Sequence, residues 1–291
     1  MRTPAKFVSL LRGYRNNFAT RSSAARLPLT TEEARVLDVI ERYEFKYLVP
    51  ERLVPAIRAT ACAIGRLDRY AGPGGVYRIR SLYLDTRGFD LYWANAREQR
   101  DRFKLRVRTY PGKTSPAFLE VKRRVQDVII KSRAAVPASE WRDLLAPGRP
   151  PSLDRLSPGA RKGAEKFIGA LHRHDLRPTL LVDYEREAYE STLDSYARLT
   201  FDRKIVCQRR ETMDLDASEG GWRPVDHPVQ TQTPEPVCVL ELKFERRPPA
   251  WMVALVRRLD LVRHSFSKYC YGVTAQLTLP EARAARVAGW Q

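Results

Sequence analysis

Long apolar runs and paired cysteines are both missing from this chain of 291 residues. No apolar run approaches the roughly 18 residues that a membrane-spanning helix needs, so no such helix is expected. The four cysteines, at positions 62, 207, 238 and 270, lie far apart and form no Cys-x-x-Cys pair. This spacing argues against a zinc ribbon and against a disulfide-bonded scaffold, and it fits a reducing compartment.

Acidic residues are scarce relative to basic ones. The chain has 52 lysines and arginines against 34 aspartates and glutamates, which gives a formal net charge of +18. Such an excess indicates a polyanionic partner: a nucleic acid, an anionic membrane surface, or a phosphate-rich molecule or polymer. A generally basic background is the alternative explanation. With 43% hydrophobic residues, the chain can bury a sizeable core.

The N-terminal segment differs from the rest of the chain. Its first 31 residues carry six basic residues and no acidic one. A secretory signal would need a longer apolar centre and a small-residue cleavage site. We therefore expect residues 1–35 to be a basic, mobile tail, and residues 36–291 to form one domain.

Alternation of apolar and polar residues dominates that domain and predicts strands. Helical spacing fills several of the intervals, and Pro55 inside the first of them predicts a late helix start or a kink. The expected strands are 41–49, 76–86, 102–110, 117–125, 127–136, 179–189, 197–207 and 237–246. The expected helices are 50–67, 137–146, 157–174 and 248–261.

The polar faces of these strands are unusual because they consist mostly of arginine and lysine with a few glutamates. In "RFKLRVRTY" (102–110), for example, cations occupy every second position. An open sheet with a basic face is one arrangement. In the other, the sheet closes into a barrel of about eight strands, which can hold one ligand. Converging cations would then require a bound anion. The predicted fold is α+β, a closed antiparallel β-barrel of about eight strands with flanking helices.

Glutamates recur beside these cations on the same strand faces. Arginine binds phosphate oxygens through a rigid fork, and lysine supplies a compact charge. An ionised glutamate cannot bind phosphate, but it can hold a hard divalent cation that bridges to phosphate. Each Glu-x-Lys pair alone would be read as a surface salt bridge; their repetition across distant strands favours a site. The same-face groups are Lys104, Arg106 and Arg108; Glu120 and Lys122; Lys131 and Arg133; and Glu241, Lys243 and Glu245.

Nine short motifs between about residues 41 and 279 together resemble the VTC (vacuolar transporter chaperone) catalytic domain, in the order of that family. They are "RYEFKY", "IRSLYLDT", "FKLRVRTY", "FLEVKRR", "IIKSR", "VDYEREAY", "ARLTFD", "LELKF" and "SFSKY". This family belongs to the triphosphate tunnel metalloenzyme, or CYTH-like, superfamily. One departure is Arg42, which stands at the first Glu of the Glu-x-Glu-x-Lys motif of the wider superfamily.

The resemblance implies a basic tunnel in which the γ-phosphate of ATP is transferred to a growing polyphosphate chain, with Mn²⁺ or Mg²⁺ bound. It implies that Arg106, Arg108, Lys122, Arg186 and Arg198 act on the transferred phosphate. Further phosphate contacts are implied for Lys46, Lys104, Lys131, Arg133, Lys243 and Lys268. Glu241 is the implied metal ligand, with Glu44 as a second candidate.

Two other functions stay open at this point: an inorganic triphosphatase of the CYTH type, and a non-catalytic module that binds polyphosphate or another anion. Nucleic acid is not expected as the partner, since only the charge favours it and no RNP-like motif, zinc finger or basic heptad helix occurs. The SPX-type sensor and membrane helices of the eukaryotic complexes are not found in the sequence. We expect a cytoplasmic enzyme that acts on ATP and polyphosphate; a membrane-protein partner, and with it a peripheral location at a membrane, stays open.

Overall fold

The computed structural model describes residues 42–276, except 114, 126–127, 147, 149–151, 195 and 218–219. The tail expected over residues 1–35 lies outside these residues and stays a prediction. Within the described part of the chain, no helix is long and apolar enough to cross a membrane.

One antiparallel sheet carries the fold, and each of the eight predicted strands is present in it. Its hydrogen-bonded order is β1 (Arg42–Pro50), β10 (Val237–Glu245), β8 (Ala197–Arg209), β7 (Arg177–Ser191), β3 (Val76–Asp85), β4 (Asp101–Thr109), β5 (Ala117–Val125) and β6 (Val128–Val136). Two short strands that the sequence did not predict lie outside this order and pair with central strands: β2 (Gly65–Leu67) with β7, and β9 (Arg223–Pro224) with β8.

The sheet is curved, and its closure into a barrel is not confirmed. The pairing order starts at β1 and ends at β6, and within the described range these two strands are not paired with each other. Nevertheless, Lys122 Nζ on β5 lies 3.1 Å from Glu44 Oε2 on β1. Strands near the two ends of the order therefore face each other across the inner side of the sheet.

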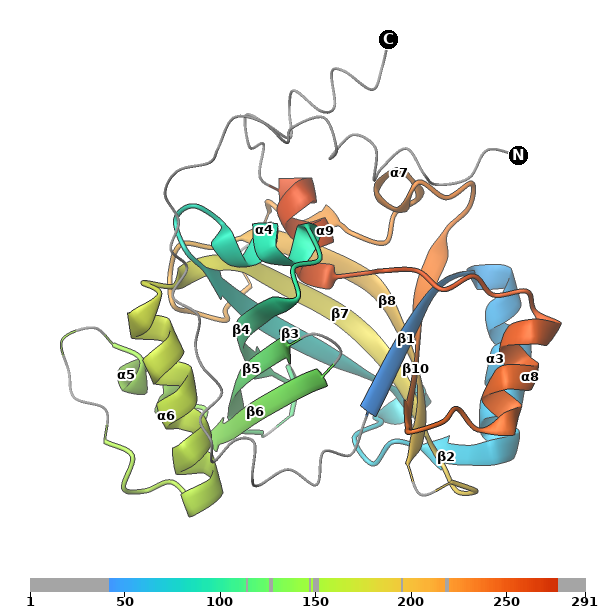
Figure 1. The fold of residues 1–291 in the computed structure, drawn as a ribbon, viewed down its shortest axis with the longest axis horizontal. Coiled ribbons are helices and arrows are strands. Elements are labelled where there is room, and N and C mark those ends of the chain that lie inside the picture. Colours follow the sequence, from blue (N-terminus) through green and yellow to red (C-terminus); the bar gives the residue numbers. More distant parts are fainter. Residues whose placement is uncertain are drawn as a thin grey trace, which may run out of the picture. The chain divides into compact units, whose positions relative to one another are not determined.

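Helices lie in three groups around the sheet (Figure 1). Two of them, α3 (Val54–Ile64) and α8 (Ala250–Arg258), lie beside β1 and β10, whereas α5 (Trp141–Leu144) and α6 (Pro158–Arg173) lie beside β4 to β6. The third pair, α4 (Asp90–Ala96) and α9 (Lys268–Gln276), lies together, with Gly272 of α9 packed against Leu180 of β7 and Cys207 of β8. The remaining helical segments are η1 (Glu51–Leu53), η2 (Pro73–Gly75) and α7 (Pro228–Thr231).

The predicted helices with long apolar spacing are present in the structure. The helices expected over 157–174 and 248–261 are confirmed as α6 and α8. In the segment 50–67, a 3₁₀ turn precedes α3, and Pro55 lies in the first turn of that helix, where its missing N–H costs nothing. The helix expected over 137–146 is only the four-residue α5, and α4 and α9 were not predicted.

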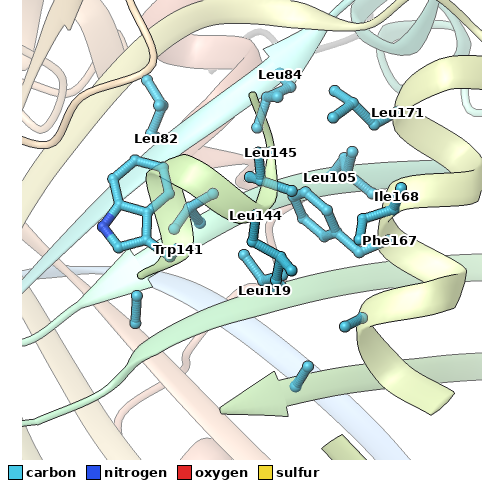
Figure 2. Close-up of a cluster of buried hydrophobic side chains, with 14 of the residues drawn as sticks. Leu82, Leu84, Leu105, Leu119, Trp141, Leu144, Leu145, Phe167, Ile168 and Leu171 are labelled. Atoms are coloured by element: carbon cyan, nitrogen blue, oxygen red, sulfur yellow. The ribbon is translucent and has the colours of Figure 1, made fainter. Parts of the chain in front are cut away.

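Two apolar clusters lie between the outer face of the sheet and these helices. In one, Leu105 and Leu119 from the sheet pack with Trp141 of α5 and Phe167 of α6 (Figure 2). The other joins residues such as Leu199, Phe201 and Leu240 of the sheet to Ile57 of α3 and Met252 of α8. Burying such a side chain stabilises the fold by about 1.5–3 kcal/mol. Because the apolar faces point outward to the helices, the charged faces are left to point inward.

Helix α6 approaches the sheet so closely that only glycine fits at its point of contact. A Cβ at Gly163 would lie 2.7 Å from the backbone oxygen of Arg133, whereas a Cβ at Gly169, on the same helix, meets nothing within 4 Å.

We expect Gly163→Ala to lower the free energy of unfolding by about 1–3 kcal/mol, because helix and strand must separate. Gly169→Ala is the matched control and should raise it by up to about 1 kcal/mol. Urea unfolding of the three proteins tests this, and equal effects of the two changes would contradict it.

Candidate active site

The register of the strands places most of the predicted cations on one face of the sheet. Arg106 on β4 is the Cα partner of Tyr83 on β3 and of Glu120 on β5. Glu120 is in turn paired with Arg133 on β6. Because side chains alternate between faces along a strand and paired residues share a face, these four side chains form one row across the inner side.

Glu120 lies at the centre of a first group of charges, the Glu120 cluster, and is only 2% exposed. Burial would raise the pKa of this carboxyl, but the cations around it, led by Arg108 and Arg106, hold the pKa well below its usual range. The carboxylate is therefore ionised and is surrounded by more positive charge than it can neutralise. Its contacts are Arg106 Nε at 2.8 Å, Lys131 Nζ at 3.0 Å, Arg133 Nε at 3.5 Å and Arg108 Nε at 3.7 Å.

A second group, the Glu241 cluster, lies on β7, β8, β10 and α9. Asp202 is fully buried and accepts two hydrogen bonds from Arg186, at 2.6 and 2.7 Å, and it also pairs with Lys268. Glu241 is contacted by Arg186 Nη2 and Lys268 Nζ at 3.3 Å each and by Lys243 Nζ at 3.0 Å. Burial would raise the pKa of Glu241, but Lys243, Lys268 and Arg186 hold the pKa well below its usual range.

Glu44 on β1 connects the second cluster to the opposite wall. Its carboxylate contacts Lys46 Nζ at 2.9 Å and Lys122 Nζ at 3.1 Å, and Lys243 Nζ lies 4.0 Å away. Burial would raise the pKa of Glu44, but Lys122, Lys46 and Lys243 hold the pKa well below its usual range. Lys46 also lies 4.0 Å from Glu241, so these lysines bridge the two carboxylates.

Two of the predicted phosphate-binding residues lie apart from these clusters. Lys104 shares the inner face of β4 but donates to Ser267 Oγ at 3.0 Å, in the segment that precedes α9. Arg198 lies near the start of β8, 43% exposed, and in the described part of the chain its carboxylate partner is Glu190, 2.6 Å away on β7. Arg198 is the Cα partner of Lys243 and so adjoins the Glu241 cluster, but among the described residues it forms no ion pair with the carboxylates of either cluster.

Several residues of the site were not among the predicted ones. Asp202 holds Arg186 and Lys268, and the alternation in "ARLTFD" could have placed it on the same face as Arg198. Tyr83 accepts a hydrogen bond from Arg106 at 2.8 Å. The ring of Tyr184 lies under both Arg186 and Lys268, with 5.5 and 4.8 Å from cation to ring centre. No signal in the sequence distinguishes these two tyrosines from the other aromatic residues.

Some polar atoms of the inner face are buried without a hydrogen-bond partner in the described part of the chain. Arg108 Nε, Ser81 Oγ and Thr200 Oγ1 are buried, and none has a hydrogen-bond partner within the described residues. Ser81 is the Cα partner of Arg108, and Thr200 is that of Glu241. Since buried polar groups are nearly always hydrogen-bonded in folded proteins, these atoms can take up hydrogen bonds from water or from a polar ligand between the clusters.

The carboxylates of the site fit part of a metal site. The described residues hold no group of three His, Cys, Asp or Glu side chains that could bind a metal ion by themselves. Glu44 and Glu241 are ionised and share two lysines. Mg²⁺ is commonly held by one or two carboxylates together with phosphate oxygens and water, and this pair matches that donor set.

Two lysines of the inner face should make anion binding depend on pH. Burial, with help from neighbouring cations, lowers the pKa of Lys104 to about 8, and burial lowers that of Lys131 to about 8 although Glu120 opposes the shift. Each must be protonated to bind phosphate. Above about pH 8 the free protein must take up a proton to bind, so affinity falls by up to about tenfold per pH unit for each lysine.

We therefore expect the affinity for inorganic tripolyphosphate to decrease from about pH 8 upward. Lys104→Arg, whose guanidinium stays charged, should make this decrease about tenfold smaller per pH unit. Titration calorimetry at several pH values measures it, with Lys204→Arg as the control because Lys204 is exposed and paired with Glu185. An affinity that is constant from pH 7 to about pH 10 in the unaltered protein would contradict the expectation.

Comparison with known proteins gives one family match and several similar structures. The model of the VTC domain matches residues 41–277. A candidate adenylate cyclase from Bacillus halodurans is 13% identical, with a TM-score of 0.43 over 78% of this chain and 96% of its own. A Pyrococcus horikoshii protein is 11% identical, with a TM-score of 0.39 over 84% and 99%. A candidate adenylate cyclase from Vibrio parahaemolyticus is 11% identical, with a TM-score of 0.40 over 80% and 97%.

Identities and scores this low carry no inference about chemistry, so the family assignment depends on the domain match alone. That match covers most of the chain and the same segment as the nine sequence motifs. The chain belongs to the VTC domain family.

Proposed function

We propose that this protein is a metal-dependent polyphosphate polymerase, which transfers the γ-phosphate of ATP to a growing polyphosphate chain on the inner face of its sheet. The observation that carries the proposal is the inner face itself. Its arginines and lysines outnumber the carboxylates that they contact, Glu44, Glu120, Asp202 and Glu241, and Arg108 Nε is buried without a hydrogen-bond partner among the described residues. A row of surplus cations suits a chain of phosphates better than a single anion.

The arginines are already oriented for this role. Arg106 is held by Glu120 and Tyr83, and Arg186 by both oxygens of Asp202. Phosphoryl transfer depends mainly on in-line positioning and on neutralising charge on the transferred group. Donors fixed before the substrate arrives need no reorganisation during the reaction. We assign this function to Arg106, Arg108, Lys122, Arg186 and Arg198, and binding of the remaining phosphates to Lys46, Lys104, Lys131, Arg133, Lys243 and Lys268.

The carboxylates favour phosphate over water as the acceptor. A general base works best when its pKa lies near the working pH. The pKa values of Glu44, Glu120 and Glu241 are all held well below the usual range, so each is a weak base. A terminal phosphate of the polymer is already ionised and needs no base, whereas an attacking water molecule would profit from one.

Glu241 and Glu44 are the residues that would hold Mn²⁺ or Mg²⁺. A divalent cation there supplies further neutralisation of the phosphate charge. The closed tunnel is part of the proposal as well, and the contact of Lys122 with Glu44 across the inner side supports it. The cysteines are all free, which supports a cytoplasmic location.

Product analysis tests the proposed reaction. Purified protein with ATP and Mn²⁺ should accumulate ADP together with polyphosphate, which is resolved by gel electrophoresis. Removing one preorganised charge costs a factor of about 10²–10³ in rate. Arg106→Ala and Glu241→Ala should therefore lower the rate at least about 100-fold, whereas Lys204→Ala, on the exposed side, should leave it unchanged.

Two other outcomes of this experiment would contradict the proposed function. Release of orthophosphate without polymer would make the protein a triphosphatase. Binding of ATP or polyphosphate with no turnover in Mn²⁺ or Mg²⁺ would make it an anion-binding module.

A further inference from the structure

Four aromatic rings form a cluster at one end of the charged face, which we call the aromatic cluster: Tyr70, Tyr77, Tyr110 and Phe118. The rings of Tyr70 and Tyr110 are nearly parallel, with 9° between their planes and 5.9 Å between their centres. The centre of the Tyr110 ring also lies 6.0 Å from that of Tyr77 and 5.8 Å from that of Phe118, which it meets edge-on. The residues come from three strand regions and one loop, so the cluster exists only in the folded chain.

The aromatic cluster directly adjoins the candidate phosphate site. Arg133 contacts Glu120, and its guanidinium lies 3.6 Å from the centre of the Phe118 ring. Tyr77 is the Cα partner of Arg186. Tyr110 follows β4 directly, two residues after Arg108, and so continues the inner face of that strand. A ligand bound to Arg108 would therefore reach Tyr110.

The outer side of the aromatic cluster is accessible and carries more cations. Tyr70 is 41% exposed, although it is a large aromatic residue. The guanidinium of Arg69 lies 4.8 Å from the centre of its ring, and Lys113 Nζ lies 5.4 Å from the centre of the Tyr77 ring. Lys113 also donates to the backbone oxygen of Tyr70, which ties the loop after Tyr110 to the loop that holds Tyr70. The two parallel rings are thus held at the surface.

Phosphate groups do not stack on aromatic rings, but nucleobases do. Base–aromatic stacking, aided by nearby arginines, is a general means of holding a base. We propose that Tyr70 and Tyr110 form a nucleobase-binding site, which stacks the base of ATP while its phosphates lie on the arginines of the inner face. This inference rests on the proposed function, and it predicts that a nucleoside triphosphate binds more tightly than inorganic tripolyphosphate.

Binding measurements with two ligands test this directly. We expect Tyr70→Ala and Tyr110→Ala each to weaken ATP binding by roughly 5- to 150-fold, the loss of one stacked base. Binding of inorganic tripolyphosphate should change less than about twofold, because that ligand has no base. Tyr70→Phe and Tyr110→Phe keep the rings and should bind ATP as the unaltered protein does. Titration calorimetry without catalytic metal measures all of these affinities.

Arg108→Ala is the matched control for the phosphate site and should weaken both ligands alike. Retained tripolyphosphate binding shows that a tyrosine variant is folded. The proposal is overturned if the tyrosine variants bind ATP normally, or if they lose ATP and tripolyphosphate equally. Should the unaltered protein bind tripolyphosphate and show no preference for ATP, only the base site is wrong. Should it bind neither ligand, the proposed function fails and the base site fails with it.

Discussion

Repulsion between like charges is the constraint on which this structure depends. Arginines and lysines from β1, β4, β5, β6, β7 and β10 share one inner face, and α9 adds Lys268. They can lie this close together only because Glu44, Glu120, Asp202 and Glu241 lie among them. Removing one partner of a buried ion pair typically costs about 3–5 kcal/mol, since the other charge is left uncompensated. The same carboxylates therefore fix the directions of the cations and stabilise the inner face.

The charged face can lie on the inner side of the sheet because helices cover the apolar face on the outer side. In most antiparallel sheets the apolar face is in the core and the polar face is in water. Here α3 and α8 cover one part of the apolar face and α5 and α6 another, so the curved sheet has its hydrophobic cores outside and its charges within. Gly163 shows how close this packing is, because a single added methyl group would meet the backbone of β6.

The third pair of helices contributes to the site through a buried carboxylate. Asp85, at the end of β3, is fully buried and accepts hydrogen bonds from the backbone N–H groups of Leu91 and Tyr92 at the start of α4. Tyr269 of α9 donates to the same carboxylate. Because Lys268 precedes Tyr269 in the chain, the hydrogen bonds of Asp85 that hold α4 and α9 also fix the position of Lys268 in the Glu241 cluster.

By itself the sequence determined the eight main strands and their inner faces, because side chains alternate strictly along a strand, as Arg106 and Arg108 do. The order of its short motifs determined the family. The sequence did not determine which charges meet. Lys122 faces Glu44 across the sheet, Asp202 holds Arg186, and Arg198 pairs instead with Glu190. The aromatic cluster likewise depends on residues that are distant in the chain, whereas α4 and α9 are too short for their apolar spacing to predict a helix. Curvature, strand order and the docking of helices bring together residues that are distant in the chain, and those depend on packing that no local pattern records.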